Sequence, residues 1–259
     1  MSDTLVKQDP GAPEGFFEAE AAGLRWLGEA TGAGGARVVR VIAVAPGRIE
    51  LERIRTIRPE PAAARAFGAA LARTHAAGAA AFGAPPAGWD GPGFIGSRPQ
   101  SFAHERSWGI FYARDRVLPF LAIAERAGSV TAEEARDIRH ACALIADGIF
   151  DDDEPPARLH GDLWNGNLLW SDQGAVLIDP AAHGGHRETD LAMLALFGAP
   201  RLDEILAGYE RQHPLRAGWR ERIPLHQLHP LAVHAASHGR GYGVELAAAA
   251  RATTGLAER

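Results

Sequence analysis

Cysteine and lysine are both nearly absent from this 259-residue sequence. The only cysteine, Cys142, cannot form an intramolecular disulfide, which favours a reducing compartment and a fold stable without covalent cross-links. Its apolar neighbours indicate a buried structural thiol rather than a nucleophile. Lys7 is the only lysine among 27 basic residues, and the others are arginines. A biased composition could leave one lysine by chance, so the position of Lys7 decides how much it means.

Long apolar runs and an excess of positive charge are also missing. No run approaches the ~18 residues of a membrane span, and Met1–Thr4 shows no basic and then apolar leader. The formal net charge of −5 disfavours nucleic acids and anionic membranes as partners. With 46% hydrophobic and 23% charged residues, the chain can bury a sizeable core. We therefore expect a cytoplasmic globular protein.

The first 56 residues predict a small α+β unit. Apolar periodicity indicates a helix over 16–29, and Thr31–Gly35 is rich in glycine and is typical of a turn. Strands are expected at 4–7, 38–45 and 49–54, the last two joined by Pro46-Gly47. We take residues 1–56 as an N-terminal lobe.

The remainder, residues 57–259, predicts a mainly helical lobe. Helices are expected at 61–78, at 102–127, at 131–149 with a Thr131–Glu134 capping box, and over most of the chain from 189 onward. Residues 82–100 are rich in glycine and proline and predict a surface loop, and the acidic run 151–156 predicts a solvated turn. Three short strands are expected at 158–160, 168–170 and 175–178.

One constellation carries chemistry. Asp162 and Asn167 lie five residues apart after His160, as in the catalytic loop of kinases, and Asp179 ends an apolar strand twelve residues later. Phosphoryl transfer needs a carboxylate that accepts the proton of the attacking hydroxyl, together with hard oxygen ligands for Mg²⁺. A single His-x-Asp is most often a structural turn, but the joint pattern between strands is far more specific.

The segments that contain these residues resemble the signature of the fructosamine (ketosamine-3-) kinases. The matching segments are His160–Asn167, Asp179–Ala181, Gly185–Met193, Phe94–Gly96 with Pro99-Gln100, and Trp108. Aminoglycoside and choline kinases share the His-Gly-Asp triplet and the later aspartate, whereas Leu163-Trp164 and the His186–Glu188 run point to the fructosamine branch. The resemblance covers nearly the whole chain.

The resemblance implies an α+β, protein-kinase-like fold with two lobes and with ATP and Mg²⁺ in the cleft. The implied reaction is transfer of the ATP γ-phosphate to a hydroxyl, O3 in this family, of a ketosamine carried by a small amine or by a protein lysine. Phosphorylation there is followed in the family by loss of the sugar, so the implied role is deglycation. No nucleic acid or membrane partner is expected.

The resemblance also implies roles for individual residues. Asp162 would be the catalytic base, and Asn167 and Asp179 would hold Mg²⁺. Lys7 would contact the α- and β-phosphates, where a compact ammonium and a forked guanidinium are not equivalent. Glu20 would pair with Lys7; Glu18 is the neighbouring alternative.

Further positions are implied with open alternatives. Glu52 and Ile54 resemble the hinge whose backbone binds adenine, although they also suit an ordinary strand end. His160 and Asp190 would support the catalytic loop, although Asp190 could simply be an acid at a helix N-terminus. Trp164 and His183 are candidate substrate contacts, and His183 could equally fill a turn.

One part of the family pattern is missing. Only six residues precede Lys7, whereas the family has two strands and a loop that cover the ATP phosphates. Gly32–Gly35 follows the helix and cannot replace that loop. We therefore expect a truncated N-terminal lobe with weak ATP binding. The alternatives to a ketosamine kinase are an aminoglycoside or amino-alcohol kinase and an inactive pseudokinase that binds a ligand.

Overall fold

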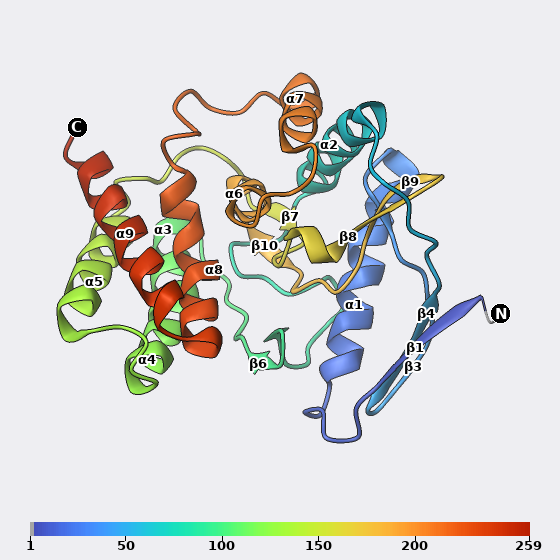
Figure 1. The fold of residues 1–259 in the computed structure, drawn as a ribbon, viewed down its shortest axis with the longest axis horizontal. Helices are drawn as coiled ribbons and strands as arrows, with labels where there is room; N and C mark the ends of the chain where they lie inside the picture. The colour runs from blue at the N-terminus through green and yellow to red at the C-terminus, as the bar shows by residue number, and fades with distance from the viewer. Residues whose placement is uncertain (1–2) are drawn as a thin grey trace.

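The computed structural model describes residues 3–259 as helices on both sides of several small sheets (Figure 1). The helices are α1 (Phe16–Gly28), α2 (Pro61–Ala76), α3 (Trp108–Phe111), α4 (Leu118–Arg126), α5 (Ala132–Ala146), α6 (Glu188–Leu196), α7 (Leu202–Gln212), α8 (Ile223–His238) and α9 (Arg240–Ala257). The strands are β1 (Thr4–Gln8), β2 (Arg37–Val38), β3 (Val41–Ala45), β4 (Arg48–Glu52), β5 (Phe94–Ile95), β6 (Arg98–Pro99), β7 (Ala157–Leu159), β8 (Leu168–Ser171), β9 (Gly174–Leu177) and β10 (His183–Gly185).

The N-terminal sheet has the order β1-β4-β3 and is antiparallel throughout. Alternate residues of β4 face α1, so that Ile49 and Leu51 are buried with Phe17 and Leu24 in one apolar cluster. Lys7 lies opposite Ile49 in the register. The order makes β1 an edge strand, and Lys7 lies one residue before its end.

The predicted strand over 38–45 is divided in two. Arg37 and Val38 form β2, which pairs in parallel with Val176 and Leu177 of β9, whereas β3 pairs with β4. The chain leaves one sheet and enters another between Val38 and Val41, so the continuous strand is wrong. This crossing joins the first 56 residues to the β8–β9 hairpin. A division into lobes near residue 56 stays our proposal.

The helical part packs around a large apolar cluster. α4, α5, α8 and α9 contribute to it, with Ile138 of α5, Leu228 of α8 and Leu246 of α9 fully buried (Figure 1). α2 and α7 approach each other closely because glycines face the partner backbone. A Cβ on Gly68 would lie 1.9 Å from the Ile205 carbonyl oxygen, so these two helices could not pack this way with a larger residue.

Other expectations need correction in this part of the chain. The predicted loop 82–100 contains the β5–β6 hairpin, and residues 102–107 are not helical, because the helix begins at Trp108 after an N-cap at Ser107. The strand β10 was not predicted from the sequence. The capping box at Thr131 and Glu134 is confirmed. Within residues 3–259, no helix is long and apolar enough to cross a membrane.

The acidic run after α5 is partly exposed, with Asp151 and Asp153 on the surface, but two of its carboxylates also make contacts across the fold. Asp151 accepts hydrogen bonds from the Gly109 N–H and the Ser107 hydroxyl, both at 2.7 Å, at the start of α3. Asp152 lies 3.4 Å from both His186 and Arg216. These carboxylates contact residues that are distant in sequence, and the charge of the run did not predict those contacts.

Candidate active site

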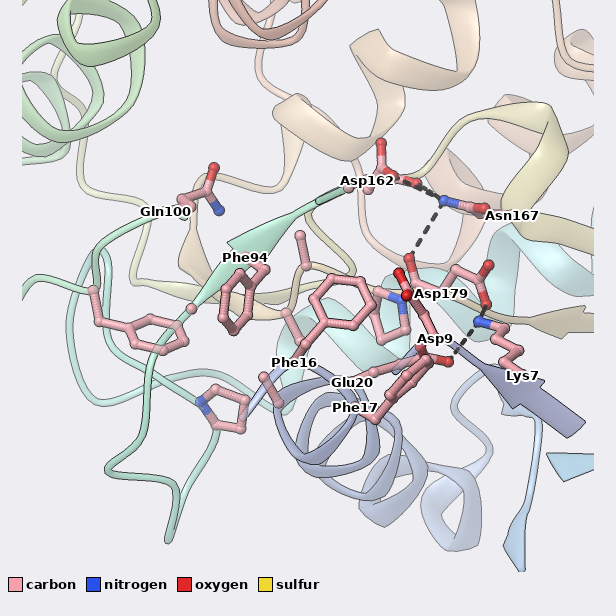
Figure 2. A pocket seen from close by; sticks show the side chains of 18 of the residues that line it. Lys7, Asp9, Phe16, Phe17, Glu20, Phe94, Gln100, Asp162, Asn167 and Asp179 are labelled. Carbon is pink, nitrogen blue, oxygen red and sulfur yellow. Dashed lines mark hydrogen bonds and ion pairs between the residues drawn. The ribbon is translucent and has the colours of Figure 1, made fainter. Parts of the chain in front are cut away.

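A cavity of about 510 Å³ lies between the N-terminal sheet, α1 and the segments that follow β5 and β9 (Figure 2). Most of the residues singled out from the sequence line it. Its polar lining residues are Lys7, Gln8, Asp9, Glu20, Gln100, Asp162, Asn167 and Asp179. Its aromatic lining residues are Phe16, Phe17, Phe94, Phe102 and Trp164.

The loop between β7 and β8 presents Asp162 to the cavity. Asn167 donates from Nδ2 to the Asp162 backbone oxygen at 2.8 Å and to its Oδ2 at 3.0 Å. The same nitrogen lies 3.4 Å from the backbone oxygen of Asp179, which ties the loop to the residue after β9. Figure 2 shows Asn167 and Asp179 at the same end of the cavity. The carboxylate of Asp162 is thus held in one orientation with its Oδ1 outside these bonds.

The surroundings of Asp162 suit a proton acceptor. Burial raises the pKa of this carboxyl above its ordinary value, and the nearby Asp190 and Asp179 act in the same direction. His160 and the hydrogen bond from Asn167 oppose the rise without cancelling it. A carboxylate with a raised pKa binds a proton more strongly and is a better general base near neutral pH.

His160 stabilises the catalytic loop through two hydrogen bonds of its imidazole. Its Nε2 donates to the Ile178 carbonyl at 2.8 Å, and its Nδ1 accepts from the Asp162 N–H at 3.2 Å. These partners place a proton on Nε2 and leave Nδ1 as the acceptor. The imidazole therefore connects the catalytic loop to the end of β9 and does not face the cavity.

Asp190, in the first turn of α6, holds the loop backbone from the other side. Its carboxylate is 1% exposed and accepts from the His160 N–H at 2.8 Å, the Gly161 N–H at 3.0 Å and His75 Nε2 at 3.2 Å. Burial alone would raise the pKa of Asp190, but these partners outweigh burial and lower it. His75, from α2, is a member of this network that sequence reasoning missed, because no local motif marks it.

Gly161 is required between these contacts. Its φ is +82°, a left-handed conformation, and a Cβ at this position would lie 2.2 Å from the Ala181 carbonyl oxygen. Any side chain would push the catalytic loop away from the Asp179–Ala181 segment. The close approach of the two segments places Asp162 near Asp179.

Lys7 joins the N-terminal sheet to the loop after β9. Its Nζ donates to Glu20 Oε1 at 2.7 Å and to Asp179 Oδ1 (Figure 2). Burial lowers the pKa of Lys7, but the two carboxylates raise it above its ordinary value. Glu18, the alternative partner, points elsewhere and has a buried oxygen without a hydrogen-bond partner. The single lysine thus pairs with two acidic residues of the cavity wall, Glu20 and Asp179.

The four other candidates lie partly outside the cavity. Trp164 lines the cavity and is 41% exposed. His183 is buried, with its Nδ1 bonded to the Ala181 carbonyl at 2.8 Å, and burial lowers its pKa to about 3. Glu52 forms an ion pair with Arg37, and Ile54 packs on the apolar cluster beneath β4. Neither His183 nor the Glu52–Ile54 segment lines this cavity.

A compact group with metal-ligand chemistry lies outside the cavity. The ligand atoms of His186, Glu188 and His226 all lie within 4.8 Å of one another and are buried. Arg222 donates to both oxygens of Glu188, at 2.6 and 2.9 Å, and the Thr189 hydroxyl lies 3.0 Å from His226. Because these partners already satisfy the carboxylate, we interpret the group as a structural network.

Known proteins resemble the chain over almost its full length. A family model described as fructosamine kinase matches residues 2–253. A probable ketoamine kinase of Enterococcus faecium is 31% identical and aligns over 93% of this chain and 84% of its own. A crystal structure from Thermobifida fusca, assigned to the fructosamine-3-kinases, is 46% identical with a TM-score of 0.89, over 97% of this chain and 85% of the other.

More distant structures share the fold alone. A choline/ethanolamine kinase family protein from Mesorhizobium loti is 17% identical with a TM-score of 0.56, and covers 98% of this chain and 82% of its own. The likeness confirms the protein-kinase-like fold that was expected from the sequence. Because the family model matches residues 2–253 and relatives of 31% and 46% identity align over more than nine tenths of the chain, the chain belongs to the fructosamine kinase family.

Proposed function

We propose that this ATP-dependent small-molecule kinase transfers the γ-phosphoryl group to a sugar hydroxyl of a ketosamine, with Asp162 as the base. The observation that carries the proposal is the meeting of Lys7, Asp162, Asn167 and Asp179 in one cavity. They come from β1, the catalytic loop and the end of β9, and only the fold brings them together. Family membership supports both the reaction and the class of acceptor.

Asp162 would act on the acceptor. Its carboxylate accepts a hydrogen bond from the attacking hydroxyl and takes the proton as that oxygen bonds to the γ-phosphorus. The bond between the γ-phosphorus and the bridging oxygen breaks, and the products are ADP and a sugar phosphate. The raised pKa of Asp162 favours this proton transfer.

Lys7 and Glu20 would act on the nucleotide. An ammonium held by two carboxylates at the cavity wall can turn toward the α- and β-phosphates without leaving Glu20. Glu20 is the more buried partner, with 10% of its side chain exposed compared with 39% for Asp179. We propose that the Glu52–Ile54 backbone binds adenine, since Ile54 packs on the same cluster as Leu169 and Ile178 beside the catalytic hairpin.

Asn167 and Asp179 fit a divalent cation. An amide oxygen and a carboxylate are the hard ligands that Mg²⁺ prefers, and both side chains lie at the Lys7 end of the cavity (Figure 2). A bound Mg²⁺ supplies charge neutralisation for the phosphates. Asp179 has a φ of +53°, a left-handed conformation that aspartate tolerates better than most residues, which turns its carboxylate into the cavity.

The acceptor would be a ketosamine on a small amine or on a protein lysine. The family reaction at O3 is followed by loss of the sugar, so we extend the proposal to deglycation. Trp164 lies on the solvent side of the cavity and would contact the part of the acceptor that extends outward.

The experiment is an ATP- and Mg²⁺-dependent assay with fructosyl-lysine and ribosyl-lysine analogues beside aminoglycosides and simple amino alcohols. The expected result is preferential phosphorylation of the ketosamines, and a ~10²-fold or larger loss of turnover in Asp162→Asn with nucleotide binding retained. Preference for aminoglycosides would move the protein to that branch. Nucleotide binding without transfer to any acceptor would indicate a pseudokinase.

A further inference from the structure

The end of the cavity opposite Lys7 differs from the rest in the chemistry of its lining side chains. Charged lining residues lie on β1, α1, the catalytic loop and the end of β9, whereas Phe16, Phe94 and Phe102 line the far end. The rings of Phe16 and Phe94 meet edge to face at 5.3 Å, which closes this end between α1 and β5. Gln100 is the polar side chain among these rings (Figure 2).

Gln100 is buried without a full set of hydrogen bonds. It is 5% exposed, and its Oε1 has no hydrogen-bond partner among residues 3–259. A buried amide oxygen without a donor destabilises a folded protein by about 1–3 kcal/mol, so such groups are rare unless a ligand or water completes them. Gln100 belongs to the lining of the cavity, and Figure 2 shows it on the side opposite Lys7.

The backbone around Gln100 is fixed. The Gln100 N–H donates to the Gly93 carbonyl at 2.8 Å, and a Cβ on Gly93 would lie 2.4 Å from the Gln100 carbonyl oxygen. Arg98, on β6, donates to the Ser237 hydroxyl and to the Ala236 carbonyl at the end of α8, both at 2.7 Å. The hairpin is thereby anchored to the helical part, and the amide is positioned before any ligand arrives.

We propose that Gln100 is a specificity residue whose amide hydrogen-bonds a second hydroxyl of the acceptor while Asp162 binds the reacting one. A primary amide donates and accepts, as a sugar hydroxyl does, so the two groups satisfy each other. The rings of Phe94 and Phe102 suit the C–H face of a sugar. Because none of the described residues at this end is charged, the part of the acceptor bound here is a neutral polyol.

The inference rests on the proposed function, since Asp162 must bind the reacting hydroxyl. It adds a reason for selectivity. An acceptor without a second hydroxyl, such as a simple amino alcohol, leaves the buried amide unpaired, and sites built in this way discriminate strongly against analogues that lack the group. Gln100 therefore selects polyhydroxylated acceptors over simple amino alcohols.

The test compares Gln100→Met, which keeps the shape but removes the amide, with the parent protein. The probe is 1-alkylamino-1-deoxyfructose, measured by calorimetry with ADP and Mg²⁺ present and by steady-state transfer from ATP. We expect acceptor Kd and KM to rise about tenfold, with the KM for ATP within about twofold of the parent because Gln100 lies far from Lys7. A deoxy analogue that lacks the hydroxyl bound by Gln100 should bind the parent and Gln100→Met with the same affinity.

Two further variants serve as controls for the comparison between Gln100→Met and the parent. Gln227→Met makes the same chemical change outside the cavity, where the amide donates to the Ala192 carbonyl at 3.0 Å, and should leave acceptor affinity unchanged. Gln100→Asn keeps an amide in the same surroundings but withdraws it from the ligand, so it should weaken acceptor binding in the same direction with the fold preserved.

The outcomes separate the two proposals. If both Gln100 variants bind the sugar amine as the parent does, the specificity role is wrong and the proposed function stands. If the parent binds the sugar amine but transfers no phosphate, the proposed function is wrong, and the ratio of dissociation constants between parent and variants still decides the role of Gln100. If the parent neither binds nor phosphorylates it, both proposals fail.

Discussion

Replacing Asp190 by asparagine tests how the catalytic loop is held. The substitution keeps the size of the side chain and exchanges one carboxylate oxygen for an NH₂ group. Oδ2 accepts from the His160 N–H and from His75, and Oδ1 accepts from the Gly161 N–H. The best asparagine orientation keeps its oxygen toward His160 and His75, which leaves the NH₂ facing the Gly161 N–H.

The magnitude follows from that mismatch. One hydrogen bond to a charged group, worth about 1.5–3 kcal/mol, is lost, and a buried N–H is left unpaired at about 1–3 kcal/mol. We expect the free energy of unfolding to fall by about 3–5 kcal/mol. The Gly161 backbone must also move, and a shift of about 1 Å in Asp162 would lower kcat by about 10²-fold.

The assay is urea unfolding followed by circular dichroism, together with kcat and KM for ATP. Asp203→Asn is the matched control, because Asp203 is an exposed acid in the first turn of α7 and offers only the favourable interaction with the helix dipole, about 0.3–1 kcal/mol. If Asp190→Asn behaves like this control, with kcat within about twofold of the parent, the carboxylate does not hold the loop and our reasoning is refuted.

Two further predictions concern the metal and acid stability. Asp179→Ala should abolish Mg²⁺-dependent turnover, because it removes the main hard ligand; a variant that titrates with Mg²⁺ and ATP like the parent would show that Asp179 is not a ligand. Burial lowers the pKa of His226 to about 4 despite the neighbouring Glu188, while His186 and Arg222 add to the lowering. Because the unfolded chain binds this proton first, stability should fall from about pH 6.5 toward pH 4, by up to ~1.4 kcal/mol per pH unit. Urea unfolding at pH 7, 6 and 5 measures this loss, and equal stability at all three would contradict it. The His226→Gln substitution should reduce the dependence of the free energy of unfolding on pH by the equivalent of one bound proton.

Local chemistry made part of the site predictable. Asp162, Asn167 and Asp179 belong to a short motif whose spacing follows from one loop and one hairpin, so they could be placed without the fold. Glu20 was implied by the family resemblance, with Glu18 as the alternative, and the structure pairs Glu20 with Lys7.

The remaining features depend on contacts between distant segments. β2 is two residues long and pairs with β9, where Arg37 lies opposite Val176, so no periodicity could reveal it. The β5–β6 hairpin is equally short, and glycine and proline concealed it. His75 reaches Asp190 across 115 positions of sequence. The contacts of the acidic turn after α5 with His186 and Arg216 could not be predicted, because these partners lie far away in the sequence.

The ion pairs of Lys7 also bear on the protein's own chemistry with reducing sugars. Glycation begins when an uncharged amine attacks a sugar aldehyde, and a chain with one lysine offers a single side-chain amine. Glu20 and Asp179 hold that amine protonated, since they raise its pKa despite burial. A protein that acts on glycated amines would therefore be a poor substrate for glycation itself, and its arginine-rich surface would keep its positive charge where a lysine-rich one would lose it.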